Sequence, residues 1–247
     1  MKRKKLILSL FMAITSVIYQ PLTASIPKET KILKPRLVVL TDIAPVEVEP
    51  DDMESMIRLL SHADLFEIEA LITNSGWNSS GKKYPNEWTN NLHKVINAYE
   101  KDVKNLMKRS QQKEFMTLEE EAKKQYIGYW PSPAYLRSRI KMGSLEFGHK
   151  ILGENNNSDG SDFLITLIDE KDNRPLFIGL WGGGNTLAQA IWKIEQERGK
   201  AEAEKILKKI YIYAITDQDV AWNDREKHTL SSHYWLRKEF GAKIYCG

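Results

Sequence analysis

Four carboxylates gather near the start of the chain, where an apolar run meets a helical pattern. In the segment VVLTDIAPVEVEPDDMESM, Asp42 directly follows the apolar run, and Glu49, Asp51 and Asp52 precede the helical pattern. Carboxylates that lie close together repel one another and are costly to desolvate, so we expect a cation among them or a proton on one of them. Their hard oxygens favour Ca²⁺ or Mg²⁺. Alternatively, Asp51 and Asp52 only complement the dipole at the helix N-terminus.

Polar loops also follow three other apolar runs. NSGWN (residues 74–78) follows FEIEALIT, GGGN (182–185) follows PLFIGLW, and DQD (217–219) follows IYIYAIT. The carboxyl ends of parallel strands lie at one edge of a sheet, and the ligands of open α/β sheets bind there. We therefore expect these loops to meet Asp42 at one site.

The sequence gives no support for several other kinds of site. The five histidines show no zinc-ligand spacing, and Cys246 is the only cysteine. The sequence has no G-x-S-x-G elbow of the kind that serine hydrolases use, and WGGGN lacks the Gly-Lys-Ser/Thr ending of a phosphate loop. Ala44 stands where an aspartyl-phosphate phosphatase would carry its second acid.

The apolar pattern alternates between strands and helices along the chain. We expect strands at 36–41, 66–73, 175–181, 210–216 and 242–246, and helices at 51–63, 87–107, 161–168, 186–197, 201–209 and 229–239. Residues 108–135 should run over the surface, with a helix at TLEEEAKKQY. This alternation predicts an α/β fold with an open, mainly parallel sheet and helices on both faces.

The N-terminal segment has the composition of a targeting signal. Residues 1–24 begin with basic residues, continue with an apolar stretch from Leu6 to Tyr19 and end in small residues, which is typical of a bacterial secretory signal peptide. The alternative is an uncleaved anchor, but the apolar stretch is shorter than the ~20 residues of a spanning helix. We expect cleavage near Ser25, a linker over residues 25–35, and a periplasmic or extracellular protein without a stable membrane anchor.

Composition and charge limit the number of domains and the kinds of partner that the protein can have. The 247 residues, 42% of them hydrophobic, are enough for one sizeable globular domain, which we place at residues 36–247. Residues 1–24 contain four of the 36 Lys and Arg residues and none of the 33 Asp and Glu residues. Removal of this segment leaves 32 basic and 33 acidic residues and changes the net charge from +3 to −1. We therefore expect no affinity for nucleic acid. The sequence leaves the oligomeric state open.

Five segments carry a family resemblance. VVLTDI…EPDDMESMIRLL, FEIEALI, GSDFLI, PLFIGLWGGGNTLAQA and YAITDQD resemble, in this order, the nucleoside-hydrolase-like domain of bacterial secreted proteins described as cellulose-binding. The resemblance runs from about Arg36 to the C-terminus. That domain is related to the calcium-dependent, inosine- and uridine-preferring nucleoside hydrolases, which cleave the N-glycosidic bond of ribonucleosides.

The resemblance implies a role for each polar residue of the expected site. Asp42 and Asp52 would bind Ca²⁺ together with a backbone carbonyl near Gly182, and Asp42 would also activate a metal-bound water. The resemblance implies that Asp51 and Asn78 contact the sugar and that Asn185 lies next to the metal. Together with Asp217 and Asp219 from the loop after the strand at 210–216, these residues are the candidates for substrate binding. Glycosidic cleavage passes through an oxocarbenium-like state, and a water positioned by carboxylates and a cation suits that chemistry.

The sequence also departs from the nucleoside hydrolases. The loop between Asp42 and Asp51 is longer, Leu40 replaces an aspartate of the strand, and residues 217–219 replace the usual substrate loop. These differences favour a sugar or oligosaccharide over a nucleoside. A later metal-binding aspartate would lie beyond Gly247, so we expect the domain to be incomplete at its C-terminal end. The expected function is an exported hydrolase that cleaves N-ribosyl or O-glycosyl bonds with a Ca²⁺-activated water. The alternatives are a non-catalytic carbohydrate-binding protein and an inactive fragment of such a hydrolase.

Overall fold

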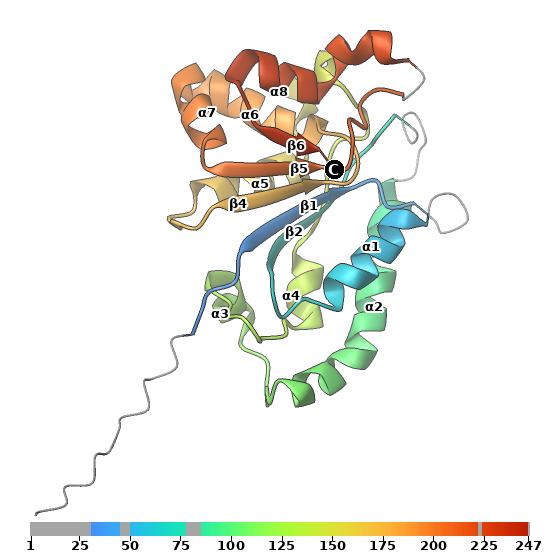
Figure 1. The fold of residues 1–247 in the computed structure, drawn as a ribbon, viewed down its shortest axis with the longest axis vertical. Helices are drawn as coiled ribbons and strands as arrows, with labels where there is room; N and C mark the ends of the chain where they lie inside the picture. Colours follow the sequence, from blue (N-terminus) through green and yellow to red (C-terminus); the bar gives the residue numbers. More distant parts are fainter. Residues whose placement is uncertain (1–30, 45–49, 78–84, 222–223, 247) are drawn as a thin grey trace, which may run out of the picture. The chain divides into compact units, whose positions relative to one another are not determined.

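The apolar runs of the sequence form one parallel sheet (Figure 1). In the computed structural model, residues 31–44, 50–77, 85–221 and 224–246 are described, and within them the sheet has six strands in the order β3-β2-β1-β4-β5-β6. Every neighbouring pair is parallel. The strands are β1 (Arg36–Thr41), β2 (Glu67–Thr73), β3 (Ile140–Met142), β4 (Leu176–Leu180), β5 (Ile210–Ala214) and β6 (Ile244–Cys246). The expected open α/β fold is therefore confirmed.

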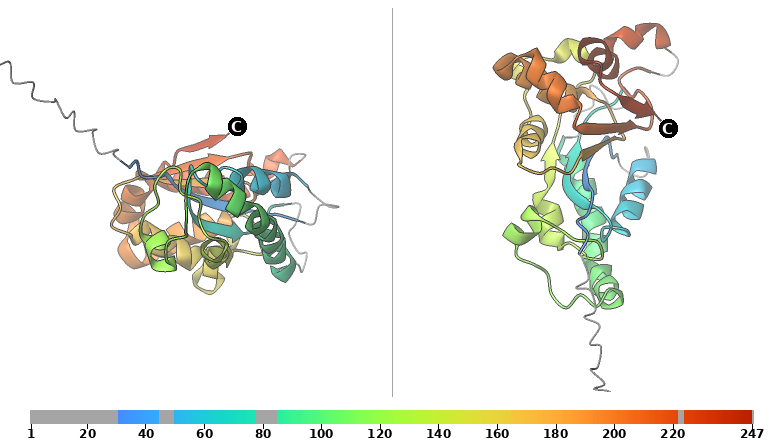
Figure 2. Two further views of the ribbon diagram at one scale, coloured as in Figure 1. Left: turned by 90° about the horizontal axis from the view of Figure 1, so that it is seen from below. Right: turned by 60° about the vertical axis from the view of Figure 1, so that its left-hand side comes forward.

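Helices pack against both faces of the sheet (Figures 1 and 2), but on one face the side chains of Phe177, Tyr211 and Tyr213 in β4 and β5 stay exposed. Alternate residues of a strand point to opposite faces, so Val39 packs with one helical layer and Val38 with the other. The first layer contains α1 (Asp51–Leu60) and α2 (Pro85–Arg109). The second contains α5 (Asp159–Asp169), α6 (Asn185–Arg198), α7 (Lys200–Leu207) and α8 (Ser232–Phe240). None of the described helices is both long enough and apolar enough to cross a membrane.

The segment expected to run over the surface contributes to the core instead. The helix expected at TLEEEAKKQY is present as α3 (Leu118–Lys123), which begins with a capping box at Thr117. The sequence did not predict α4 (Pro133–Ser138) or strand β3, and Tyr135 and Leu136 are buried in the layer of α1 and α2. The expectation of a surface excursion was therefore wrong for these residues.

Buried ion pairs hold the amino ends of the central strands. Arg36 Nε lies 2.6 Å from Glu69 Oε1, and Arg174 Nη1 lies 2.6 Å from Glu67 Oε2. Burial raises the pKa of Glu69 to about 7, and the Arg36 guanidinium opposes that rise. The neighbouring Lys34, which the sequence places in the linker, is fully buried, and its Nζ donates to the carbonyl oxygen of Ala63. The compact unit extends from residue 31 to residue 247.

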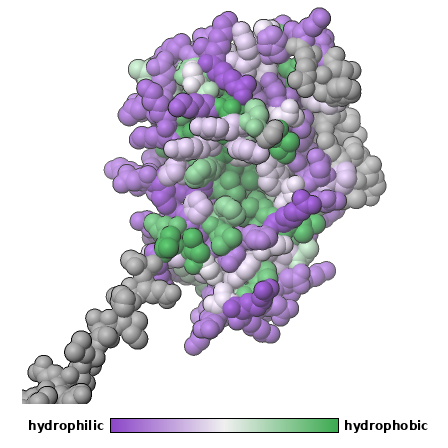
Figure 3. Space-filling model, in the orientation of Figure 1, coloured by the Kyte–Doolittle hydropathy of each residue, from purple (hydrophilic) through white to green (hydrophobic). Residues whose placement is uncertain are grey.

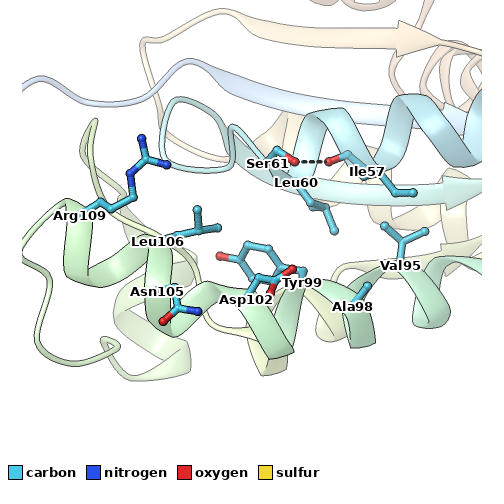
Figure 4. A pocket seen from close by; sticks show the side chains of 10 residues that line it. All are labelled: Ile57, Leu60, Ser61, Val95, Ala98, Tyr99, Asp102, Asn105, Leu106 and Arg109. Atoms are coloured by element: carbon cyan, nitrogen blue, oxygen red, sulfur yellow. Dashed lines mark hydrogen bonds between the residues drawn. The ribbon is translucent and has the colours of Figure 1, made fainter.

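Two hollows lie on the side of the sheet that carries α1 and α2. One, of about 350 Å³, lies between these helices and is lined by Leu60, Val95, Tyr99 and their neighbours (Figure 4). The other is a groove of about 510 Å³ over β1, β4 and β5, in the middle of the hydrophobic face in Figure 3. We call this groove the aromatic face. Its aromatic lining is Phe66, Phe177, Trp181, Tyr211, Tyr213 and Tyr245.

Candidate functional site

The loops after four strands meet at the carboxyl edge of the sheet. The backbone nitrogen of Asn74, after β2, donates to Thr41 O of β1 at 2.9 Å. Trp181 N, after β4, donates to Leu40 O at 2.8 Å, and Trp77 N donates to Gln218 O, after β5, at 2.8 Å. The predicted meeting of these loops is observed in the described residues. Between β1 and β4 the strand order reverses, and this is the position where open α/β sheets bind ligands.

Asp42 and Asp52 both lie near the carboxyl end of β1, at this reversal point. Both residues are buried, with 3% of their surface exposed. Thr41 Oγ1 donates a hydrogen bond to Asp52 Oδ2 and accepts one from Ile43 N at 3.1 Å, so the last residue of β1 fixes the first turn of α1. A Cβ on Gly182 would lie 2.9 Å from Asp42 N and 3.0 Å from Asp42 Cγ. Glycine at this position thus lets the turn after β4 approach the carboxylate of Asp42.

Two buried asparagines line the turn between β4 and α6. Asn74 Nδ2 donates to the carbonyl oxygen of Gly183, and Asn185 Nδ2 donates to Ser144 Oγ at 2.7 Å and to the carbonyl oxygen of Glu146. Among the described atoms, the Oδ1 atoms of both asparagines are buried without a hydrogen-bond partner. The sequence predicts a role for Asn185 but not for Asn74.

Asp219 links the N-termini of two helices. Its Oδ1 accepts a hydrogen bond from Gly184 N at 2.9 Å, and its Oδ2 accepts one from Ser232 N at 2.8 Å. Gly184 N and Ser232 N lie at the N-termini of α6 and α8, where the positive end of the helix dipole favours a carboxylate. Asp217 Oδ1 accepts from Asp219 N at 3.2 Å and lies 3.5 Å from Nδ1 of the fully buried His233. No spacing in the sequence pointed to His233.

The remaining predicted residues lie in different surroundings. Asp51 is the first residue of α1 and is exposed, whereas Asp52 beside it is buried. Asn78 and Glu49 lie outside the described residues. The assignment of substrate-binding roles to Asp51, Asn78, Asn185, Asp217 and Asp219 stays a prediction.

The donor atoms at the reversal point are of the kind that a hard cation prefers. Two buried carboxylates and the free amide oxygen of Asn74 are oxygen ligands, which suit Ca²⁺ better than Zn²⁺. In the described part of the chain, no three His, Cys, Asp or Glu side chains come together closely enough to hold a metal. By the chemistry of their oxygen atoms, the two carboxylates and the Asn74 amide suit a hard cation such as Ca²⁺.

Comparisons with known proteins agree with the observed fold. The family described as "Cellulose-binding Sde182, nucleoside hydrolase-like domain" matches residues 36–246. A solved structure, described as a nucleoside hydrolase-related hypothetical protein from Saccharophagus degradans that is associated with carbohydrate metabolism, superposes on 84% of this chain with a TM-score of 0.65 and 30% sequence identity. This chain spans 42% of that protein's length. No curated protein matches significantly.

Proposed function

Because the chain belongs to the nucleoside-hydrolase-like domain family of the cellulose-binding Sde182 proteins, we propose that the carboxyl edge of its sheet binds a sugar and hydrolyses a glycosidic bond. The observation that carries this proposal is the burial of Asp42 and Asp52 at the reversal point of the strand order. Two carboxylates at the position where such sheets bind ligands can stabilise the positive charge of an oxocarbenium-like state.

Each residue at the reversal point has a distinct task in this proposal. Asp42 would accept a proton from the attacking water, and Asp52, whose orientation the Thr41 hydroxyl fixes, would hold the cation. Gly182 keeps the turn after β4 close to Asp42. When bound, Ca²⁺ would lower the pKa of a water molecule and hold sugar hydroxyls. With two carboxylate ligands we expect affinity in the weak range, ~10⁻⁴–10⁻³ M.

Binding without hydrolysis is the second candidate function. It is favoured by the absence, from the described residues, of a third acid, histidine or cysteine that could hold a metal with this pair. A loosely held cation would still contact sugar hydroxyls but would not fix the attacking water against the anomeric carbon. In both cases the signal-like residues 1–24 and the cellulose-binding family support an exported protein that meets a glycan outside the cytoplasm.

The test combines calcium-dependent stability with turnover. Thermal unfolding is measured with and without Ca²⁺ for the wild type, Asp42→Asn and Asp52→Asn, with Asp102→Asn on the exposed face of α2 as the matched control. We expect Ca²⁺ to stabilise the wild type and the control but neither site variant. Hydrolysis of a chromogenic riboside and of cello-oligosaccharides should fall about 10²–10⁴-fold in Asp42→Asn.

The outcomes separate the two functions. A calcium response that is lost in both site variants, without any turnover by the wild type, favours the binding protein. A calcium response that is unchanged in Asp42→Asn and Asp52→Asn would reject the metal site.

A further inference from the structure

A second pocket lies beside the candidate site, on the same edge of the sheet. It has a volume of about 280 Å³ and is lined by Trp77, Phe147, Asp224, Lys227 and Leu230, among others. Trp77 and Phe147 are both half-buried, so each aromatic side chain keeps part of its surface accessible. Lys227 and Asp224 form an ion pair at the rim.

Hydrogen bonds connect this pocket to the candidate site. Trp77 N donates to Gln218 O at 2.8 Å, and Gln218 Nε2 donates to the carbonyl oxygen of Trp181 at 3.5 Å. Trp181 directly precedes Gly182, which packs on Asp42. Gln218 therefore links the pocket wall to the turn that packs on Asp42, and Asp219, which lines the pocket, bonds Gly184 N of the same turn.

The opposite wall of the pocket is held in place independently of any ligand. His149 Nδ1 makes a hydrogen bond of 2.9 Å with the carbonyl oxygen of Leu230. Gly148 has φ +84°, and a Cβ there would lie 2.8 Å from the same oxygen. The segment that carries Phe147 is thus anchored against residues 225–230, and the pocket is formed before ligand binds.

The lining of the pocket matches one sugar ring. The face of a pyranose that carries C–H bonds is apolar and packs on aromatic side chains, whereas its hydroxyl groups need polar partners at the edge. Trp77 and Phe147 supply the aromatic surface, and Asp224 and Lys227 supply the polar rim. The volume is just below the ~300–1,000 Å³ of pockets for drug-sized ligands, which suits a single ring.

We propose that the Trp77–Phe147 pocket is a second sugar subsite, which holds the neighbouring ring of an oligosaccharide whose end lies at Asp42. This inference rests on the proposed sugar site at the reversal point, and it narrows the ligand to a glycan of at least two rings. A monosaccharide occupies the Asp42 site alone and does not reach Trp77.

The test measures binding of glucose, cellotetraose and uridine to the full chain by calorimetry. The variants are Trp77→Ala, Trp77→Phe, Phe147→Ala and Asp42→Asn, and Tyr213→Ala on the aromatic face is the matched control. We expect Trp77→Ala and Phe147→Ala to weaken cellotetraose binding roughly tenfold without changing glucose binding, because an aromatic anchor of one ring is lost. Trp77→Phe should restore most of the affinity, and urea midpoints should show that all variants fold.

The outcomes distinguish failure of the second subsite from failure of the proposed site at Asp42. Unchanged cellotetraose affinity in both Trp77→Ala and Phe147→Ala overturns the subsite, and loss of affinity in Tyr213→Ala instead places the glycan on the aromatic face. Trp77-dependent binding of uridine without binding of cellotetraose also overturns it, since the pocket then holds a base. If Trp77→Ala weakens cellotetraose binding while Asp42→Asn changes neither binding nor turnover, the subsite stands and the proposed catalytic site fails.

Discussion

Replacing Asp219 tests whether one carboxylate joins α6 to α8. In Asp219→Ala, Gly184 N and Ser232 N each lose their acceptor at a buried position. A buried donor without a partner costs about 1–3 kcal/mol, and hydrogen bonds to charged groups lie at the upper end of the range. Both bonds share one carboxylate, so we expect the free energy of unfolding to fall by roughly 3–5 kcal/mol. Asp219→Asn keeps one acceptor oxygen and should lose about 1–3 kcal/mol.

Urea unfolding followed by tryptophan fluorescence and circular dichroism measures this loss. The slope with urea should stay constant, so that the midpoint reports stability. Asp102→Ala, on the exposed face of α2, is the control and should change stability by less than about 0.5 kcal/mol. If Asp219→Ala is as stable as that control, the helix link is unimportant. A loss of sugar affinity without a loss of stability would instead support the substrate-binding role that the sequence predicts for Asp219.

Three further predictions concern the buried charges and the turn after β4. Arg36→Ala leaves the Glu69 carboxylate buried without its partner and should lower the free energy of unfolding by about 3–5 kcal/mol in chemical denaturation. Burial lowers the pKa of Lys34 to about 7, so between pH 7 and about 10 the unfolded chain binds more protons than the folded chain. The free energy of unfolding should therefore rise with pH in this range. Lys34→Met should reduce the slope of that rise by up to about 1.4 kcal/mol per pH unit. Gly183→Ala would place a Cβ against the carbonyl oxygen of Ser75 and should lower the melting temperature, with a cost of about 1–3 kcal/mol.

Controls for these variants come from the same chain. Arg58→Ala removes an exposed pair with Glu54 and should cost at most about 1 kcal/mol. Gly153→Ala meets only an ordinary contact at 3.6 Å and should be tolerated. Equal effects in Arg36→Ala and Arg58→Ala, equal pH slopes with and without Lys34, or equal melting temperatures for the two glycine variants would contradict the respective prediction.

Most of the fold could be predicted because its elements carry strong local patterns. The apolar runs that form β1, β2, β4 and β5 predict strands, although Phe177 of β4 and the tyrosines of β5 are exposed on one face. Strand β3 was missed because it has three half-buried residues with Lys141 at its centre, so no apolar run marks it. Helix α5 begins at Asp159 and not at residue 161 as expected, because Ser158 is its N-cap and forms a capping box with Ser161, the third residue of the helix.

The site was predictable in position but not in detail. Polar residues after several strands located the edge of the sheet, and Asp42 and Asp52 are both buried near the carboxyl end of β1, whereas their joint role in binding a metal stays a prediction. The use of Asp219 as a helix link could not be predicted, because its partners are backbone groups from α6 and α8 that the sequence does not label. Trp77 gave no signal either, since its pocket is assembled from loops that are distant in the sequence.

The strand order determines when the candidate site forms during folding. Strand β1 pairs with β2, which follows soon after α1, and with β4, which is made only after α2 to α5. Long-range pairing of this kind is slow, and until β4 docks one edge of β1 is open to pairing with other chains. Asp42 lies at the seam between the early and the late half, so a ligand bound there contacts both. Such a ligand would slow the separation of the two halves and would protect the open edge of β1 from aggregation.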